Sequence, residues 1–464
     1  MAEVTGGAGL NSVPAPGKQT LQSAFVDLRD AGWAQQYLPE LMEKEAEVFG
    51  NRTISGFLSQ VGAEEAMASD QVIWSEQGRL HIKADLVAVT TPGTGLCTLA
   101  DHPFRVGDTV VAHATDGTGV GLTIKGYVSE VASTSTFKVL PYTSNTLTTA
   151  GFDTDTEFTM FVYGSEYVKG DTGRGEALEP GFDSFENKPV IIKDLYEVSG
   201  SDASAIGWIE VSGEDGQAGY LWYLKASGDT MSRFADYCEM VCIEGELATG
   251  TGIQAELGTL AGTEGLFAAV KNRGHITTGL GVTPTDDLAT FDNILKTFDA
   301  QGAIEENMLF VNRNVSLGID DMLAAMNSYG DGGTSYGVFD NSADMALNLG
   351  FSGFRRGSYD FYKSDWKYLN DANTRGALNG EDVRGVVVPA GVSSVYDQML
   401  GKNMKRPFLH VRYRASQTES RRMKTWITGS VGAVTSNLDA MQVNYLSERC
   451  LITQGANNFV LLTD

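Results

Sequence analysis

The chain has 464 residues, of which 42% are hydrophobic and 20% are charged, a composition typical of a globular protein with two or three domains. Its net charge of −25 argues against a nucleic-acid-binding protein, because phosphate contacts need clusters of Lys and Arg. No apolar run approaches the roughly 20 residues of a membrane span, so we expect a soluble protein. The N-terminal stretch lacks the basic and apolar regions of a secretory signal, and we expect the protein in a cytoplasm.

Glycine and cysteine usage leads to two further expectations. Glycine accounts for 54 of the 464 residues without a repeating period, which excludes a collagen-like chain and indicates many turns. The cysteines are too few and too scattered for a disulfide framework. We expect free thiols at Cys97, Cys238, Cys242 and Cys450.

The chain begins with a predicted arm and two short helices. Residues 1–18 are rich in Gly, Pro and Ser and predict an unpacked arm. Leu21, Phe25 and Leu28 then recur at helical spacing, and the run ELMEKEAEVF after Pro39 is a second amphipathic stretch. We expect both helices to pack on a neighbouring element.

From Gln71 onward the pattern is that of strands. QVIWSEQGRLHIKADLVAV has an interruption between two extended runs, which is typical of a long hairpin. Between residues 84 and 163, turn residues separate the strand candidates LVAV, DTVVAH, LTIKGYVSEV, STFKVLPY and EFTMFVY. They predict a small SH3-like or oligonucleotide-fold-like barrel. A Gly- and Pro-rich linker follows before NKPVIIKDLYEVSG returns as a strand, so the barrel resembles an insertion between the two arms of a hairpin.

The rest of the chain mixes helices and strands. Residues 230–247 predict a long helix, capped by Ser227 or Asp229, with Phe234 and Val241 on its apolar face. DDLATFDNILKTFD and SLGIDDMLAAM predict further helices, whereas MLFVNR and GVVVPAG predict strands. The end, AMQVNYLSERCLITQGANNFVLL, predicts one or two long strands. We therefore expect an α+β protein with a sheet flanked by helices.

No catalytic set is visible in the sequence. Zinc binding and nucleophilic catalysis need groups that converge, and no HxxxH or HxH pair occurs among His81, His102, His113, His275 and His410. The sequence also has no Walker loop and no HExxH. We therefore assign no catalytic, cofactor-binding or metal-binding residue, and we expect a protein that is not an enzyme.

Three weaker patterns each have a plainer explanation. Cys238 and Cys242 share a helix face and could hold a soft metal, but they lie in the apolar stripe and we expect them in the core. TGTGIQA (249–255) imitates a dinucleotide loop, yet it follows a helix instead of a strand and predicts a turn. DTDTE (153–157) lacks the central Gly and distant Glu of a calcium loop, so a hairpin tip or strand edge is expected.

Three segments carry a resemblance: NKPVIIKDLYEVSGSDASAIGWIEV, GYLWYLKASGDTMSRFADYCEMVCIEG and MKTWITGSVGAVTSNLDAMQVNYLSERCLITQGANNFVLL. Along the chain, a hairpin arm is followed by a long helix, an α/β region and a closing long strand. This order resembles the major capsid protein of tailed bacteriophages, which has the Hong Kong 97 capsid fold, and within that family it is similar to the crAss-like branch. By order of elements the resemblance covers residues 57–464.

The resemblance implies a division of the chain into seven parts. In chain order these are the N-terminal arm with short helices (1–56), the first leg of the extended hairpin loop (57–83), the inserted β-barrel domain (84–165), the linker and second leg (166–226), the peripheral domain with its spine helix (227–284), the axial domain (285–414) and the return to the peripheral domain (415–464).

The resemblance also implies a structural function, without a cofactor. We expect a major capsid protein that self-assembles into hexamers and pentamers of an icosahedral phage head enclosing double-stranded DNA, to which it does not bind sequence-specifically. Scaffold, portal and decoration proteins would be further partners, and the protein would lie in the virion after assembly in the host cytoplasm. Trp74 and Trp222 are candidate anchors to a neighbouring subunit, because aromatic residues dominate contact energy. The alternative is that each packs inside its own subunit.

Two other functions stay open at this stage. A tail, baseplate or surface-layer protein with a carbohydrate-binding barrel would form tubes, rings of one order or flat lattices instead of closed shells. An acidic hydrolase with an accessory β-domain would be a monomer or small oligomer with a pocket of convergent carboxylates.

Overall fold

The computed structural model describes residues 57–58, 63–79, 81–171, 182–203, 211–212, 218–219, 222–258, 261–281, 284–327, 353–378, 383–390, 392–397, 402–431 and 434–464. The predicted N-terminal arm and its two helices lie outside these residues. The chain divides into two compact units. The smaller contains Ile192–Cys238 and Met423–Ser447, and the larger contains Gly56–Ile191, Glu239–Arg422 and Glu448–Asp464.

The smaller unit is a sheet covered on one face by a helix. In this sheet the long strand β22 (Ala440–Thr453) pairs antiparallel with β21 (Lys424–Gly429) and also neighbours β10 (Val190–Ser199). The last residues of β22, which belong to the larger unit, pair antiparallel with β20 (Leu409–Arg414). The helix α4 (Trp222–Glu244) supplies Phe234 and Cys238 to a core with Val443 and Tyr445 of β22. Alternate residues of a strand point to one face, which is why Val443 and Tyr445 meet the helix together. The remaining elements are α3 (Gly200–Ala203), β11 (Val211–Ser212) and β12 (Ala218–Gly219).

The predicted long helix exists, but its predicted start and end are both wrong. The sequence suggested a helix over residues 230–247, whereas α4 begins at Trp222 and ends at Glu244. Ser227 therefore lies inside the helix, where its hydroxyl is 2.9 Å from that of Tyr445. Thr230 Oγ1 donates to the carbonyl oxygen of Ala226, four residues earlier, so a hydroxyl that could have served as a cap is used along the helix.

The larger unit contains a mixed six-stranded sheet. Its strands in spatial order are β13 (His275–Thr278), β23 (Val460–Thr463), β17 (Gly385–Pro389), β14 (Glu306–Val311), β16 (Tyr359–Asp365) and β15 (Gly353–Arg356). The predictions of strands in MLFVNR and GVVVPAG are confirmed as β14 and β17. The end of the chain forms two strands in different sheets, because β23 lies in this sheet between β13 and β17.

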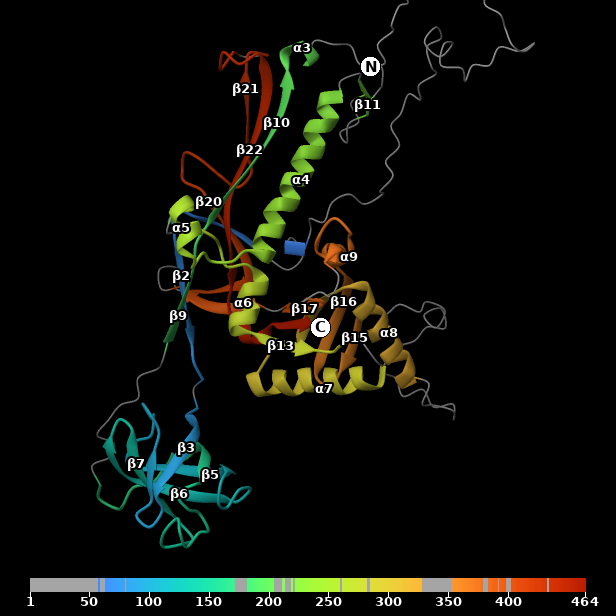
Figure 1. Cartoon of the computed structure of the whole chain (residues 1–464). Helices are drawn as coiled ribbons and strands as arrows, with labels where there is room; N and C mark the ends of the chain where they lie inside the picture. Colours follow the sequence, from blue (N-terminus) through green and yellow to red (C-terminus); the bar gives the residue numbers. More distant parts are fainter. Residues whose placement is uncertain are drawn as a thin grey trace, which may run out of the picture. The chain divides into compact units, whose positions relative to one another are not determined.

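Two helices cover one face of this sheet, and both were predicted. They are α7 (Pro284–Gln301) and α8 (Arg313–Asn327), shown beside the sheet in Figure 1. Phe291, Ile294 and Phe298 recur along α7 at three- and four-residue spacing, so one apolar stripe packs in the same core as Leu309 and Val311 of β14.

The opposite face of the same sheet carries an aromatic cluster. Phe310, between the two core residues of β14, has its ring 4.6 Å from that of Phe57, and Phe57 stacks on Trp366 at 4.5 Å. Phe267 of α6 (Leu266–Arg273) lies 6.0 Å from Trp366. Trp366 directly precedes α9 (Lys367–Asn370). The centre of the sheet is therefore packed on both faces, as the almost continuously apolar strands β17 (GVVVP) and β23 (VLLT) require.

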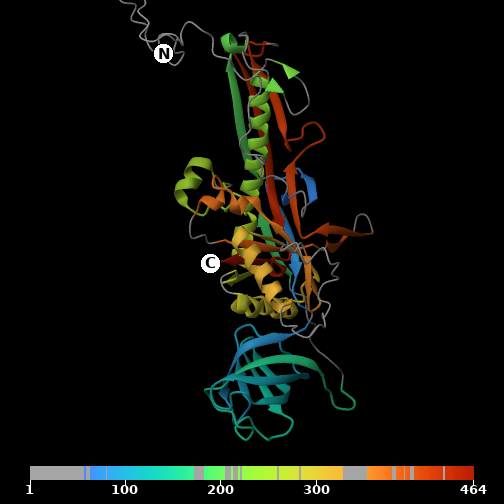
Figure 2. The ribbon, with the colours of Figure 1, turned by 90° about the vertical axis from the view of Figure 1, so that its right-hand side faces the viewer.

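The predicted barrel is confirmed as a closed six-stranded barrel (Figure 2). Around it run β3 (Lys83–Thr91), β4 (Leu96–Thr98), β7 (Thr136–Pro141), β6 (Thr123–Ser133), β5 (Asp108–Asp116) and β8 (Glu157–Ser165). The sequence did not reveal β4, which has only three residues. Gly95 has φ +76° at its start, and a Cβ there would lie 2.3 Å from the Val139 carbonyl oxygen. Only glycine fits this approach of β4 to β7.

The other elements of the larger unit are short. They are β1 (Ala63–Met67), β2 (Val72–Gln77), β9 (Phe182–Asn187), α5 (Thr251–Leu257), η2 (Arg375–Ala377), β18 (Val392–Asp397), β19 (Lys402–Pro407), β20 (Leu409–Arg414) and η3 (Ala456–Asn458). None of the helices in the described residues is both long enough and apolar enough to cross a membrane. Mixed helix and sheet with an inserted barrel agrees with the expected α+β class.

Candidate functional site

The structure keeps the residues with metal-binding chemistry apart. His113 lies on β5, His275 on β13 and His410 on β20. Within the described residues, no group of three or more His, Cys, Asp and Glu side chains could hold a metal ion.

All four cysteines are free and buried, as predicted. Cys238 packs against Phe234, Val443 and Tyr445. Burial raises the pKa of the Cys97 thiol to about 12, and burial likewise raises the pKa of the Cys450 thiol to about 12. Both thiols therefore stay protonated at neutral pH, which makes them poor nucleophiles and poor metal ligands.

The two loop patterns also have structural explanations. Residues 249–255 lead into α5, whose N-cap is Gly250, and no strand directly precedes it. Residues 153–157 form a turn before β8, in which Asp155 accepts a hydrogen bond of 3.0 Å from the Thr118 hydroxyl. The expected strand edge is confirmed at residues 153–157, which end at the first residue of β8. The turn expected at residues 249–255 is wrong, because Thr251–Leu257 is the helix α5.

The strands on either side of the barrel pair with each other. β2 and β9 form an antiparallel ladder in which Trp74 lies opposite Phe185. Trp74 is only 8% exposed, and its Nε1 donates to Glu76 at 2.9 Å. The prediction of Trp74 as an anchor to another subunit is therefore wrong, because the indole packs inside its own chain. For Trp222 only the backbone belongs to the described residues, so its side chain stays outside this comparison.

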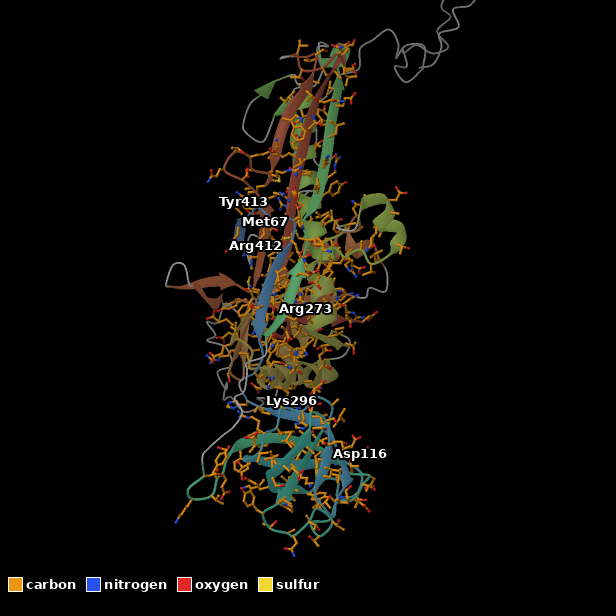
Figure 3. All side chains as sticks on the ribbon, turned by 90° about the vertical axis from the view of Figure 1, so that its left-hand side faces the viewer. Met67, Asp116, Arg273, Lys296, Arg412 and Tyr413 are labelled. Atoms are coloured by element: carbon orange, nitrogen blue, oxygen red, sulfur yellow. The ribbon has the colours of Figure 1, made fainter. Side chains whose placement is uncertain are left out.

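Arg273 of α6 holds this hairpin from one side. Its guanidinium carbon lies 4.6 Å from the ring centre of Phe185 and 5.6 Å from that of Trp74. The same guanidinium forms an ion pair of 2.7 Å with Glu264, and both side chains are less than one-fifth exposed. Figure 3 labels Arg273. The Arg273 guanidinium thus contacts two aromatic rings and a carboxylate at once. These contacts stabilise the face of the hairpin that carries Trp74 and Phe185.

We expect replacement of Arg273 by alanine to lower the free energy of unfolding by about 2 kcal/mol, because two cation–π contacts and a half-desolvated ion pair disappear together. Urea-induced unfolding followed by circular dichroism measures this loss. Arg233→Ala is the matched control, since Arg233 forms an ion pair with Asp194 at 3.2 Å but is 52% exposed. It should change stability by less than about 0.5 kcal/mol, and equal effects of the two variants would contradict the role of Arg273.

The outer face of the hairpin is different. Ile73, next to Trp74 on β2, points to the opposite face and is 64% exposed. Across the ladder Ile73 lies opposite Glu186, and Ser75 lies opposite Ser184, so Ile73 is an exposed apolar side chain among polar ones. The residue of β2 that is free to meet a neighbour is therefore Ile73.

A network of ion pairs holds β1 beside β20, with Arg412 and Tyr413 of β20 labelled near Met67 of β1 in Figure 3. Arg412 pairs with Glu65 at 3.0 Å, and Arg414 pairs with Asp70. The hydrogen bond from Asp70 raises the pKa of the Arg414 guanidinium. Glu448, whose side chain is 6% exposed, accepts from Arg414 at 3.4 Å and also from Arg421. Arg412, Arg414 and Arg421 are thus all used for ion pairs within the chain.

The sheet face of the smaller unit opposite α4 carries a ladder of polar side chains. Gln442 Nε2 donates to Glu197 at 2.7 Å, and Thr428 Oγ1 donates to Gln442 Oε1 at 3.2 Å. Asn444 Nδ2 donates in turn to Thr428 Oγ1 at 3.0 Å. The ladder crosses β10, β22 and β21, so side-chain hydrogen bonds link the three strands on this face.

The outer strand β21 carries two exposed apolar side chains. Trp426 is 37% exposed and Ile427 is 56% exposed. In the described residues β21 pairs only with β22, so its other edge is open. Sequence analysis missed this pair, although the signal was present in KTWITG. Two large apolar residues in succession on a strand cannot share one face.

No protein-family model matches the sequence, and no curated protein matches it. Many solved structures are similar to the chain, and three of them serve as examples. The capsid structure of the cyanophage P-SCSP1u is 8% identical, with a TM-score of 0.45 over 95% of this chain and 96% of that one. Mycobacterium phage Ogopogo is 10% identical, with a TM-score of 0.44 over 95% and 100%. The mature capsid of bacteriophage PhiM1 is 8% identical, with a TM-score of 0.40 over 92% of both chains. All three are phage structures, and those of P-SCSP1u and PhiM1 are capsids, which is the resemblance that the sequence predicted.

Proposed function

We propose that this chain is the major capsid protein of a tailed bacteriophage, with the Hong Kong 97 fold and without enzymatic activity. It self-assembles into hexamers and pentamers of an icosahedral head that encloses double-stranded DNA. Scaffold, portal and decoration proteins would be its further partners, and assembly would take place in the host cytoplasm. In this proposal the domain map from the sequence holds, including the N-terminal arm over residues 1–56.

The order of elements supports this proposal. A hairpin interrupted by the barrel comes first, with β2 and β9 as its paired strands. The 23-residue helix α4, the six-stranded sheet with α7 and α8, and the 14-residue strand β22 follow in the order that the resemblance requires.

The observation that carries the proposal is the edge of β21 with which no other described strand pairs, together with the exposed side chains of Trp426 and Ile427. An uncovered apolar strand edge invites pairing with another chain, and stable monomers protect such edges. Ile73 on β2 is a second exposed apolar position, in the larger unit. Two different surfaces on one chain produce heterologous contacts, which close into rings. A subunit of a shell needs contacts of this kind.

Electron microscopy of the purified full-length protein, supported by light scattering, tests the proposal. Closed shells, or uniform rings of five and six subunits, are the expected result. Tubes, rings of a single other order or flat lattices would instead favour a tail, baseplate or surface-layer protein. A monomer of 49.8 kDa that stays monomeric with a co-expressed scaffold protein, and that hydrolyses polysaccharide or ester substrates, would favour an enzyme.

We expect Trp426→Asp to abolish shell formation while the chain stays folded, because a carboxylate at the open edge repels the partner surface and touches no core cluster. Light scattering gives the particle size, and circular dichroism checks the fold. Ile253→Asp is the control, since Ile253 on α5 is 48% exposed but lies on no strand edge. Shells of normal size from the Trp426 variant would remove β21 from the proposed contacts.

A further inference from the structure

The outer wall of the barrel carries aromatic rings that the barrel core does not use. Along β8, Phe158 and Met160 are fully buried, whereas Phe161 and Tyr163 are 47% and 50% exposed. This is the alternation of a strand with one face in the core. Tyr142, just after β7, is 49% exposed. Exposed aromatic residues gathered on one wall are uncommon in the absence of a binding role.

A groove of about 480 Å³ runs along this wall. Tyr142 and Tyr163 line it together with Thr123 and Lys125 of β6 and with Glu166. These residues come together because β6 and β8 both pair with β5. The groove is built from strands of a closed barrel and is therefore a fixed surface.

One side of the groove is held in place by a hydrogen bond. The backbone N–H of Tyr142 donates to the carbonyl of Lys125 at 3.0 Å, which places the tyrosine beside β6. Its hydroxyl donates to Glu166 Oε2 at 2.5 Å. Loss of solvation and this bond both raise the pKa of the Tyr142 hydroxyl. The second oxygen of Glu166 remains available for the contents of the groove.

We propose that this groove binds a neutral saccharide chain. Sugars combine a flat C–H face with a rim of hydroxyls, and the groove combines flat tyrosine rings with a carboxylate, an ammonium group and a hydroxyl. The rings of Tyr142 and Tyr163 stack on the C–H face, while Glu166 accepts from vicinal hydroxyls and Lys125 donates to them. One positive and one negative charge leave the groove without net charge, which suits an uncharged ligand.

Other ligands fit the groove less well. A single-stranded nucleic acid would use the aromatic rings, but it also needs a positively charged track for its phosphates. Lys125 is the only cation that lines the groove, on a chain of net charge −25. An extended peptide would add to a sheet edge, and a closed barrel offers none. Binding of a saccharide is a property of the barrel wall and does not depend on shell assembly.

Affinity electrophoresis of the full-length protein tests the proposal. Native gels contain one of five neutral polysaccharides: a β-glucan, a xylan, an α-mannan, a galactan or dextran. We expect at least one to retard the wild-type protein. Tyr163→Ala should raise the apparent Kd at least about tenfold, because a stacked ring is lost. Glu166→Gln should weaken binding as well, since an amide accepts hydrogen bonds less strongly than a carboxylate.

Tyr237→Ala is the matched control, because Tyr237 on α4 is also exposed, at 40%, and lies outside the barrel. It should leave retardation unchanged. Absence of retardation by all five polysaccharides would overturn the proposal, and so would equal retardation of the wild type and the Tyr163 variant. Retardation by single-stranded DNA alone would assign this wall of the barrel to nucleic-acid binding. A change of particle size in the Tyr163 variant, without saccharide binding by the wild type, would assign the wall to a contact with a neighbouring copy of the chain.

Discussion

We expect replacement of Phe361 by alanine to lower the free energy of unfolding by about 3–5 kcal/mol. Phe361 on β16 is 1% exposed and lies at the centre of an aromatic group. Its ring centre is 4.9 Å from that of Phe291 and 5.4 Å from that of Phe354. Alanine leaves a cavity between α7 and the sheet that these rigid rings cannot fill. Urea-induced unfolding of the full-length protein measures the loss.

The adjacent residue gives a control on the same strand. Tyr362 points to the other face and is 51% exposed, so Tyr362→Ala should cost less than about 1 kcal/mol. Phe361→Leu, which keeps most of the volume, should fall between the two. Similar losses at positions 361 and 362 would mean that Phe361 is not part of the folded core.

Replacement of Lys363 by methionine is expected to cost about 3–5 kcal/mol, although the residue is charged. Lys363 Nζ lies 2.5 Å from Asp320 Oδ1 and 3.1 Å from the Ser316 carbonyl oxygen of α8. The side chains of Lys363 and Asp320 are 6% and 10% exposed. Methionine retains the apolar stem but removes the cation, and the buried carboxylate then loses its ion pair. Chemical denaturation again provides the measurement.

Two further variants test whether the loss of stability comes from the buried ion pair or from the removal of a charge as such. Lys83→Met breaks an ion pair with Asp85 at 2.9 Å whose side chains are both more than half exposed, and it should cost less than about 1 kcal/mol. The double variant Lys363→Met with Asp320→Leu should recover most of the loss, because an apolar pair replaces a buried ionic one at little cost. If the losses of the two single variants were simply additive, Lys363 and Asp320 would not be coupled.

Local patterns in the sequence predicted which helices and strands form better than they predicted which strands pair with one another. Five of the six barrel strands, together with α7, α8, β14 and β17, were predicted, because the burial of each follows its own two- or 3.6-residue period. The start of α4 was wrong because Ser227 and Asp229 resemble caps, yet no breaker prevents the helix from beginning at Trp222. β4 was missed because three residues carry no period.

The candidate site depended on information that periodicity does not contain. Alternation in β2 shows that Ile73 and Trp74 face opposite ways, but tertiary packing decides which of them is buried, since Trp74 shares a core cluster with Cys450 and Ile452. β22 and β23 both appeared in the terminal sequence, but their membership of different sheets is set by tertiary pairing. Lys125 and Glu166 line the same groove of the barrel, but they are far apart in the sequence and no sequence motif contains both.

The pairing of β2 with β9 has a consequence for the order of folding. The segment between them, residues 78–181, is a long loop whose closure carries a large entropic cost. The first and last strands of the barrel, β3 and β8, are themselves paired, with Lys83 opposite Phe161. A barrel that folds first therefore brings the two ends of that segment together before the hairpin forms. Once the barrel has folded, β2 and β9 are close in space although they are far apart in the sequence. Folding of the barrel therefore accelerates the pairing of these two strands.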